Sequence, residues 1–140
     1  MSTIDTNKTV ARRYLEDFWN GDEAAVIEKL AVDDVIGHPV PGQTLQGRDL
    51  LKQRHAALRG IYGDPHFAVE DLIAEGDKVL VRWSFTGKHI GPLMGAAPTG
   101  KQISIGGMNL FQFVDGKIVE FWVNADDLGE LQQLGVVLAS

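Results

Sequence analysis

The feature that most constrains the fold is a change in hydrophobic period near His66. Before it, apolar residues recur at the spacing of amphipathic helices; after it, they alternate as in half-buried strands. Helices that come first and strands that follow are typical of an α+β domain, in which the helices pack on one face of a mainly antiparallel sheet. We therefore expect one α+β domain over residues 1–140.

The first half of the chain contains three predicted helices. The first begins at a cap formed by Asp5 or Thr6, the second covers residues 23–30, and the third runs from about Gly47 to Ile61. Residues 33–42, "DDVIGHPVPG", separate the second helix from the third. They predict a short extended piece that ends in a loop bracketed by prolines and carrying His38.

The second half predicts two hairpins. Residues 66–75 and 78–87 are joined at Gly76-Asp77, and residues 102–113 and 117–123 are joined around Asp115-Gly116. A glycine- and proline-rich loop, residues 88–101, connects the hairpins. The pair Gly106-Gly107 inside a strand favours a bulge or bend, as in a sheet that curves around a cavity. Asp126 can cap a last helix over residues 127–135.

Both faces of the last hairpin are apolar. Helices can cover one face, and a second subunit is the natural cover for the other. We therefore expect a homodimer. The two sets of side chains are Phe111, Phe113, Phe121 and Val123 on one face, and Met108, Leu110 and Trp122 on the other.

The composition excludes several classes of protein. The net charge is −6 with no basic run, which argues against a nucleic-acid partner. No apolar stretch approaches the length of a membrane span or a signal peptide, and there is no cysteine, so we expect no membrane association and a cytoplasmic location. The four histidines are scattered, with His55 and His66 interpreted as surface residues, so we expect no metal site.

Five stretches spread over nearly the whole chain carry a family resemblance. They are "NKTVARRYLEDFWNGDEAAV", "HPVPGQTLQGRDLLK", "TGKHIGPLMGAAPTGK", "DGKIVEFW" and "DDLGELQQLG". In these motifs the chain resembles the SnoaL-like polyketide cyclases (ester cyclases) of the nuclear transport factor 2-like superfamily. The resemblance implies a cone-shaped fold with an internal pocket. It also implies a cofactor-free enzyme that closes a polyketide ring by intramolecular aldol chemistry.

The chain departs from this family where the resemblance places its catalytic groups. The family uses an aspartate at the position that follows Trp122, aided by a histidine and a glutamine on the partner strand. The corresponding positions hold Val123, Asn109 and Gly107. The resemblance therefore implies the fold, but the family's acid–base groups are missing.

Three residues remain as catalytic candidates: His38, Asn109 and Asp126. Asn109 can donate to a substrate carbonyl but cannot act as an acid or base, and its alternative role is a buried structural asparagine. A histidine titrates in a useful range, so His38 is a candidate proton carrier, although a lone histidine also has structural roles. Asp126 is the nearest carboxylate to the missing one, and the favoured alternative is a helix cap.

Other residues are candidates for substrate binding. His89 either lines the pocket entrance or holds the loop in place, and Arg82 needs a carboxylate partner such as Glu120 or an anionic ligand group. The remaining candidates are the apolar or small residues expected around a pocket: Trp19, Trp83, Gly107, Phe111, Phe121 and Val123.

These features predict a cyclase or isomerase that acts on a small apolar carbonyl compound of natural-product biosynthesis. Catalysis would come from a preorganised pocket and hydrogen bonding. One alternative is steroid-isomerase, dehydratase or epoxide-hydrolase chemistry on the same fold, and another is a non-catalytic binding or scaffold protein. A deep cavity with a polar group at its floor favours the catalytic alternatives.

Overall fold

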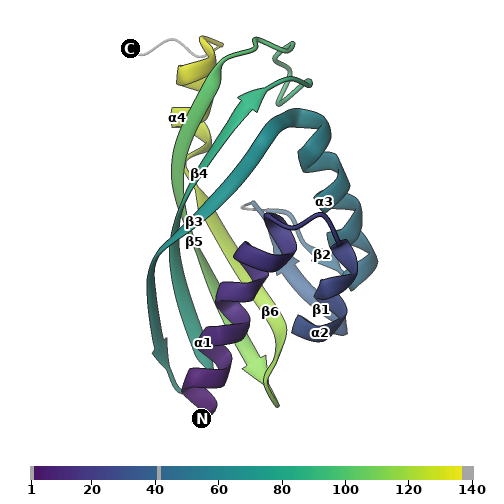
Figure 1. Ribbon diagram of the computed structural model, residues 1–140, viewed down its shortest axis with the longest axis vertical. Coiled ribbons are helices and arrows are strands. Elements are labelled where there is room, and N and C mark those ends of the chain that lie inside the picture. Colours follow the sequence, from purple (N-terminus) through teal and green to yellow (C-terminus); the bar gives the residue numbers. More distant parts are fainter. Residues whose placement is uncertain (1, 41, 137–140) are drawn as a thin grey trace.

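The computed structural model describes residues 2–40 and 42–136 and confirms the α+β architecture. Pro41, in the predicted proline-bracketed loop, lies outside the described residues. Helices pack against one curved sheet (Figure 1). The elements are α1 (Thr3–Arg13), the π-helical turn η1 (Tyr14–Trp19), the 3-10 turn η2 (Ala24–Val26), α2 (Ile27–Leu30), β1 (Ala31–His38), β2 (Leu45–Gln46), α3 (Arg48–Ile61), β3 (Tyr62–Glu75), β4 (Lys78–His89), β5 (Gln102–Val114), β6 (Lys117–Ala125) and α4 (Asp127–Leu134).

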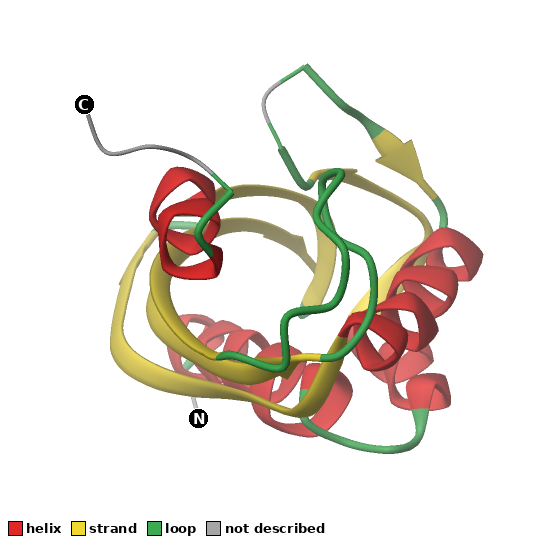
Figure 2. Cartoon of the chain, turned by 90° about the horizontal axis from the view of Figure 1, so that it is seen from above, coloured by secondary structure: helices red, strands yellow, loops and turns green. Residues whose placement is uncertain are grey.

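The six strands form one sheet in the order β2-β1-β6-β5-β4-β3. All neighbouring pairs are antiparallel except β1 and β6, which run parallel with His38 opposite Trp122. Seen from above, the strands curl around an interior, with α4 at one end and α1 and α3 along the open side (Figure 2). This curl is the cone that the family resemblance implies.

Of the two alternatives predicted for Gly106-Gly107, a bulge or a bend, the bulge is wrong. Both glycines pair without a register shift, with Ser84 and Trp83 of β4, and the shifts in β3 and β5 fall at other positions. A Cβ atom on Gly107 would lie 2.3 Å from Cζ2 of Trp83. Glycine is needed here because the indole ring occupies the space that a side chain would fill.

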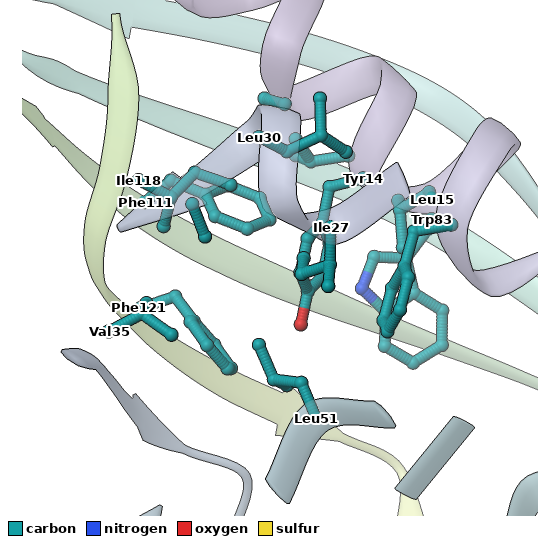
Figure 3. Packing of buried hydrophobic residues seen from close by; sticks show 14 of the residues in the cluster. Tyr14, Leu15, Ile27, Leu30, Val35, Leu51, Trp83, Phe111, Ile118 and Phe121 are labelled. Carbon is teal, nitrogen blue, oxygen red and sulfur yellow. The ribbon is translucent and has the colours of Figure 1, made fainter. Parts of the chain in front are cut away.

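The core joins the first helical segment to the inner face of the sheet. Ser2, rather than Asp5 or Thr6, caps α1 by accepting from the backbone N–H of Asp5 at 3.1 Å. The ring of Tyr14 lies 5.0 Å from that of Phe111 and 5.6 Å from that of Phe121, centroid to centroid (Figure 3). These edge and tilted contacts fix η1 over β5 and β6.

The outer face of the sheet leaves apolar side chains exposed. Ile73, Met108 and Val114 are 63%, 44% and 54% exposed, which is high for large apolar residues on one sheet. Within the described residues, no helix is long and apolar enough to cross a membrane, and no group of three or more metal-binding side chains gathers.

Candidate functional site

A cavity of about 160 Å³ lies between the inner face of the sheet and the helices η1 and α3. Most of its wall is apolar, and the polar groups on it are few. Such a cavity with a few placed polar groups is the usual form of a small-molecule site. The wall consists of Tyr14, Leu15, Trp19, Pro39, Leu45, Leu51, Arg54, Leu58, Phe67, Trp83, Asn109, Phe121 and Val123.

Asn109 of β5 presents a hydrogen-bond donor to this cavity. The indole Nε1–H of Trp83 donates to Oδ1 of Asn109 at 3.0 Å. Because indole nitrogen can only donate, this contact fixes the oxygen of the Asn109 amide toward Trp83 and the NH2 group away from it. The Asn109 side chain is only 4% exposed, but its Nδ2 atom is not sealed inside the protein without a hydrogen-bond partner. The amide N–H groups therefore face the cavity.

Tyr14 supplies a second donor. Its side chain points from η1 toward Leu51, between Phe121 and Trp83 (Figure 3). Burial raises the pKa of the Tyr14 hydroxyl well above its ordinary value, and Trp19 and the charge of Arg54 offset only part of this. The hydroxyl is therefore protonated at neutral pH and can donate to a ligand oxygen.

Two of the three positions at which the resemblance places the family's catalytic groups line this cavity, namely Asn109 and Val123. They are paired across β5 and β6, and Gly107 lies two residues from Asn109 on the same side of β5. Val123 is an apolar part of the wall, and the Trp83 indole fills the space over Gly107, which is not itself a wall residue. The site therefore contains donors and apolar surface, and none of its wall residues is a carboxylate or a histidine.

His38, a catalytic candidate from the sequence, does not reach the cavity. It stacks on Trp122 with ring centroids 5.4 Å apart, and its Nε2 lies 2.7 Å from the carboxylate of Glu120. Because Glu120 and Trp122 alternate with Phe121 and Val123 along β6, this pair belongs to the outer face. The same alternation puts His38 on the far side of the sheet from Asn109.

Four further candidates also lie away from the cavity wall. Asp126 caps α4 by accepting from the backbone N–H of Gly129 at 2.9 Å. Arg82 is on the outer face and pairs with Asp71 at 2.7 Å, so its carboxylate partner is Asp71 and not Glu120. Phe111 is fully buried in the core. His89 holds the loop after β4, because its Nδ1 lies 3.0 Å from Oγ1 of Thr99 and accepts from the Thr99 backbone N–H at 3.2 Å.

Two wall residues with polar side chains, Tyr14 and Arg54, had no site role assigned from the sequence. Tyr14 falls among apolar residues of a helical repeat, and nothing in the pattern distinguishes it from core. Arg54 has a visible signal, because it interrupts the apolar stripe of α3 between Leu51 and Leu58. A charged residue in such a stripe needs a partner or a wet cavity.

A second buried polar cluster fastens α4 to the sheet. Glu130 of α4 is 3% exposed and accepts a hydrogen bond from the hydroxyl of Tyr62. His89 is fully buried nearby, and its Nε2 has no partner among the described residues. Burial raises the pKa of the Glu130 carboxyl; the Tyr62 hydrogen bond lowers it, Asp127 raises it further, and His89 lowers it. The net direction is upward.

This shift predicts that stability declines as pH rises. A carboxyl with a raised folded-state pKa binds its proton more tightly in the folded protein, so its contribution is present at low pH and is lost as pH rises through the raised pKa. We expect the melting temperature to decrease as the pH is raised above 4.5, the ordinary pKa of a Glu carboxyl. Glu130→Gln should flatten this slope because glutamine does not titrate, and it keeps the acceptor for Tyr62. A slope of the same sign from Asp127, whose carboxyl pKa is also raised by burial, remains. The exposed Glu75→Gln is the control; equal slopes in wild type and Glu130→Gln would contradict the assignment.

The cone, its helices and its internal cavity define a protein of the nuclear transport factor 2-like fold. A family model, that of the SnoaL-like polyketide cyclases, matches residues 9–134. The chain therefore belongs to the SnoaL-like polyketide cyclase family.

Individual relatives agree with this family. The chain is 29% identical over 125 residues to aklanonic acid methyl ester cyclase AcmA of Streptomyces galilaeus, covering 89% of this chain and 87% of the relative. It resembles the structure of a candidate SnoaL-like polyketide cyclase from Jannaschia sp. CCS1, with a TM-score of 0.89, 23% identity and coverage of 99% and 98%. A candidate polyketide cyclase from Bacillus cereus ATCC 10987 gives a TM-score of 0.79, 31% identity and coverage of 95% and 83%.

Proposed function

We propose that the protein is a cyclase or isomerase for a small, apolar, polyketide-like compound that carries a carbonyl group. The observation that carries this proposal is the hydrogen bond from Trp83 to Asn109, which turns an amide N–H into an otherwise apolar cavity. A donor held in this way needs no reorganisation when charge develops on a substrate oxygen, and it acts in a site of low polarity.

The residues of the wall suit a reaction in which the substrate supplies its own acidity. Val123 cannot take a proton, and Asn109 cannot act as an acid or base. We therefore assign to the protein a substrate that enolises through its own neighbouring carbonyl groups. The enol carbon then bonds to the carbon of a second carbonyl group, whose C=O double bond opens to a C–O single bond, and the proton of the enol hydroxyl passes to this oxygen. Asn109 Nδ2–H and the Tyr14 hydroxyl would donate to the oxygen while it is negative, and the apolar wall would hold the chain in its ring-forming conformation.

Ring closure of aklanonic acid methyl ester is the first reaction to test, because the relative AcmA is named for it. We expect the purified protein to accelerate formation of the ring-closed product over the rate without protein, measured by chromatography. Between about pH 5 and 9 the rate should lack the bell shape that a protein acid–base pair imposes, because none of the wall residues is a carboxylate or a histidine. Binding of the ester without acceleration would instead indicate a binding protein.

His38→Ala provides a direct comparison within the same assay. Since His38 lies on the outer face with Glu120, we expect this variant to keep turnover within about twofold of wild type, as for a residue outside the reacting site. If His38 carried the proton, its removal would instead lower turnover by about 10²–10⁴-fold. A loss of that size in His38→Ala, with an unchanged melting temperature, would contradict the placement of the reaction in the cavity.

We also propose that two copies associate through the outer face of the sheet. Support comes from the exposure of Met108 and Val114 and from the partly buried Leu110 and Trp122 on that face, because apolar surface of this kind commonly marks an interface. Light scattering should give twice the mass of one chain for the wild type. Met108→Glu should shift the measured mass toward that of a single chain. A monomeric wild type would contradict this association.

A further inference from the structure

Arg54 lies on the cavity-facing side of α3. Leu51, Arg54 and Leu58 follow one another at helical spacing, and all three line the cavity. Arg54 is exposed at the rim, and its charge reaches far enough inward to act on Tyr14. It is therefore a cation at the mouth of the site rather than a remote surface residue.

Within the described residues, Arg54 is the arginine whose guanidinium group makes no hydrogen bond. In the described part of the chain, each of the other five arginines makes a hydrogen bond to a carboxylate or a backbone carbonyl oxygen, whereas Arg54 makes none. None of the residues that line the cavity or the hollow beside it is Asp or Glu. In a chain with a net charge of −6, the site is thus lined by a single ionised group, and that group is positive.

The size of the cavity places part of any larger substrate beside this cation. A cavity of about 160 Å³ is close to the size that holds one benzene ring. An adjoining hollow of about 240 Å³ shares Pro39, Leu45 and Arg54 with the cavity. A substrate with more than one ring would therefore leave the cavity past Arg54 and continue into this hollow.

We propose that Arg54 binds a carboxylate of the substrate at the cavity mouth, so that the protein prefers an acidic substrate to its neutral ester. This inference rests on the proposed function for its carbonyl-containing substrate class. A guanidinium group can bind a carboxylate through two parallel hydrogen bonds, which fixes orientation as well as affinity. With one end of the substrate held at the mouth, its carbonyl is oriented toward Asn109.

The test compares two probes of the same shape: 2-naphthoate and methyl 2-naphthoate. Their binding is followed by quenching of the fluorescence of Trp19 and Trp83, which line the cavity. We expect wild type to bind the acid about tenfold more tightly than the ester, as for a charge-assisted hydrogen bond at a partly exposed site. Arg54→Gln should remove this preference, so that the acid and the ester bind with equal affinity.

Arg12→Gln is the matched control, because it also removes one positive charge from an exposed arginine. Arg12 pairs with Glu16 and is distant from Arg54 in the sequence. It should keep the preference for the acid. Equal affinities of wild type for acid and ester, a preference that survives in Arg54→Gln, or no binding of either probe would overturn the proposal. The test measures binding alone, so a protein that prefers the acid but turns over no ester would keep this inference while losing the proposed reaction.

Discussion

Asn109→Ala should lower kcat/KM for ring closure by about 10²–10³-fold while leaving the protein folded. This range is typical for removal of one preorganised donor from a developing oxyanion. The large effect follows from the surroundings: the amide is 4% exposed, is held by Trp83 and faces an apolar cavity, so water replaces it poorly. Steady-state kinetics with aklanonic acid methyl ester measure this loss.

The matched control is Asn124→Ala, because Asn124 is an exposed asparagine on the outer face of the neighbouring strand β6. Its turnover should stay within about twofold of wild type. Trp83→Phe keeps an aromatic ring but removes the donor that orients Asn109, so we expect an intermediate loss. Wild-type turnover in Asn109→Ala would contradict the assigned role.

Gly107→Ala should destabilise the fold by about 1–3 kcal/mol, the usual cost of overpacking a well-packed interior. The added Cβ would lie 2.3 Å from Cζ2 of Trp83 and 2.9 Å from the carbonyl oxygen of Asn124. In a Trp83→Leu background the first clash disappears, and the cost of Gly107→Ala should fall although the second contact remains. Urea denaturation of the four proteins measures this coupling energy.

Gly60→Ala is the control for adding a methyl group. A Cβ at Gly60 meets no atom within 4 Å, and the residue lies in α3, where alanine is favoured over glycine. We expect it to be neutral or stabilising. If Gly107→Ala costs the same in the wild-type and Trp83→Leu backgrounds, the indole does not occupy the family's glutamine position.

Much of the fold follows from local pattern. The switch of period near His66 marks the start of the four long strands β3–β6, and the turns at Gly76-Asp77 and Asp115-Gly116 join these strands where expected. The local sequence pattern predicts wrongly where the burial or backbone geometry of a residue depends on a contact with a residue far away in the sequence. His55 is predicted on the surface, but it is buried and its Nε2 lies 2.8 Å from the carbonyl oxygen of Gly21. Gly107 looks like a bulge in sequence because its partner, Trp83, lies on another strand.

The site is best predicted where alternation along a strand fixes the direction of the side chains, although Trp19 of η1 was also predicted and lines the cavity. Asn109, Phe121 and Val123 lie on the cavity wall because they share the inner face of β5 and β6. Whether a residue of a loop or a strand end reaches the cavity depends on the curl of the sheet, which the sequence does not specify. His38 is the clearest case: its place in the chain suggests the mouth, but its parallel pairing with β6 turns it to the outer face.

The central claim is that the amide N–H of Asn109 donates to a carbonyl oxygen in the cavity. Infrared spectroscopy of a bound neutral ketone, 2-acetylnaphthalene labelled at its carbonyl carbon, tests this contact directly. A hydrogen bond to the oxygen weakens the carbonyl bond, so the stretching frequency should be lower in wild type than in Asn109→Ala, while Asn124→Ala should match wild type. The same carbonyl frequency in wild type and Asn109→Ala, with the ketone bound in both, would contradict the account.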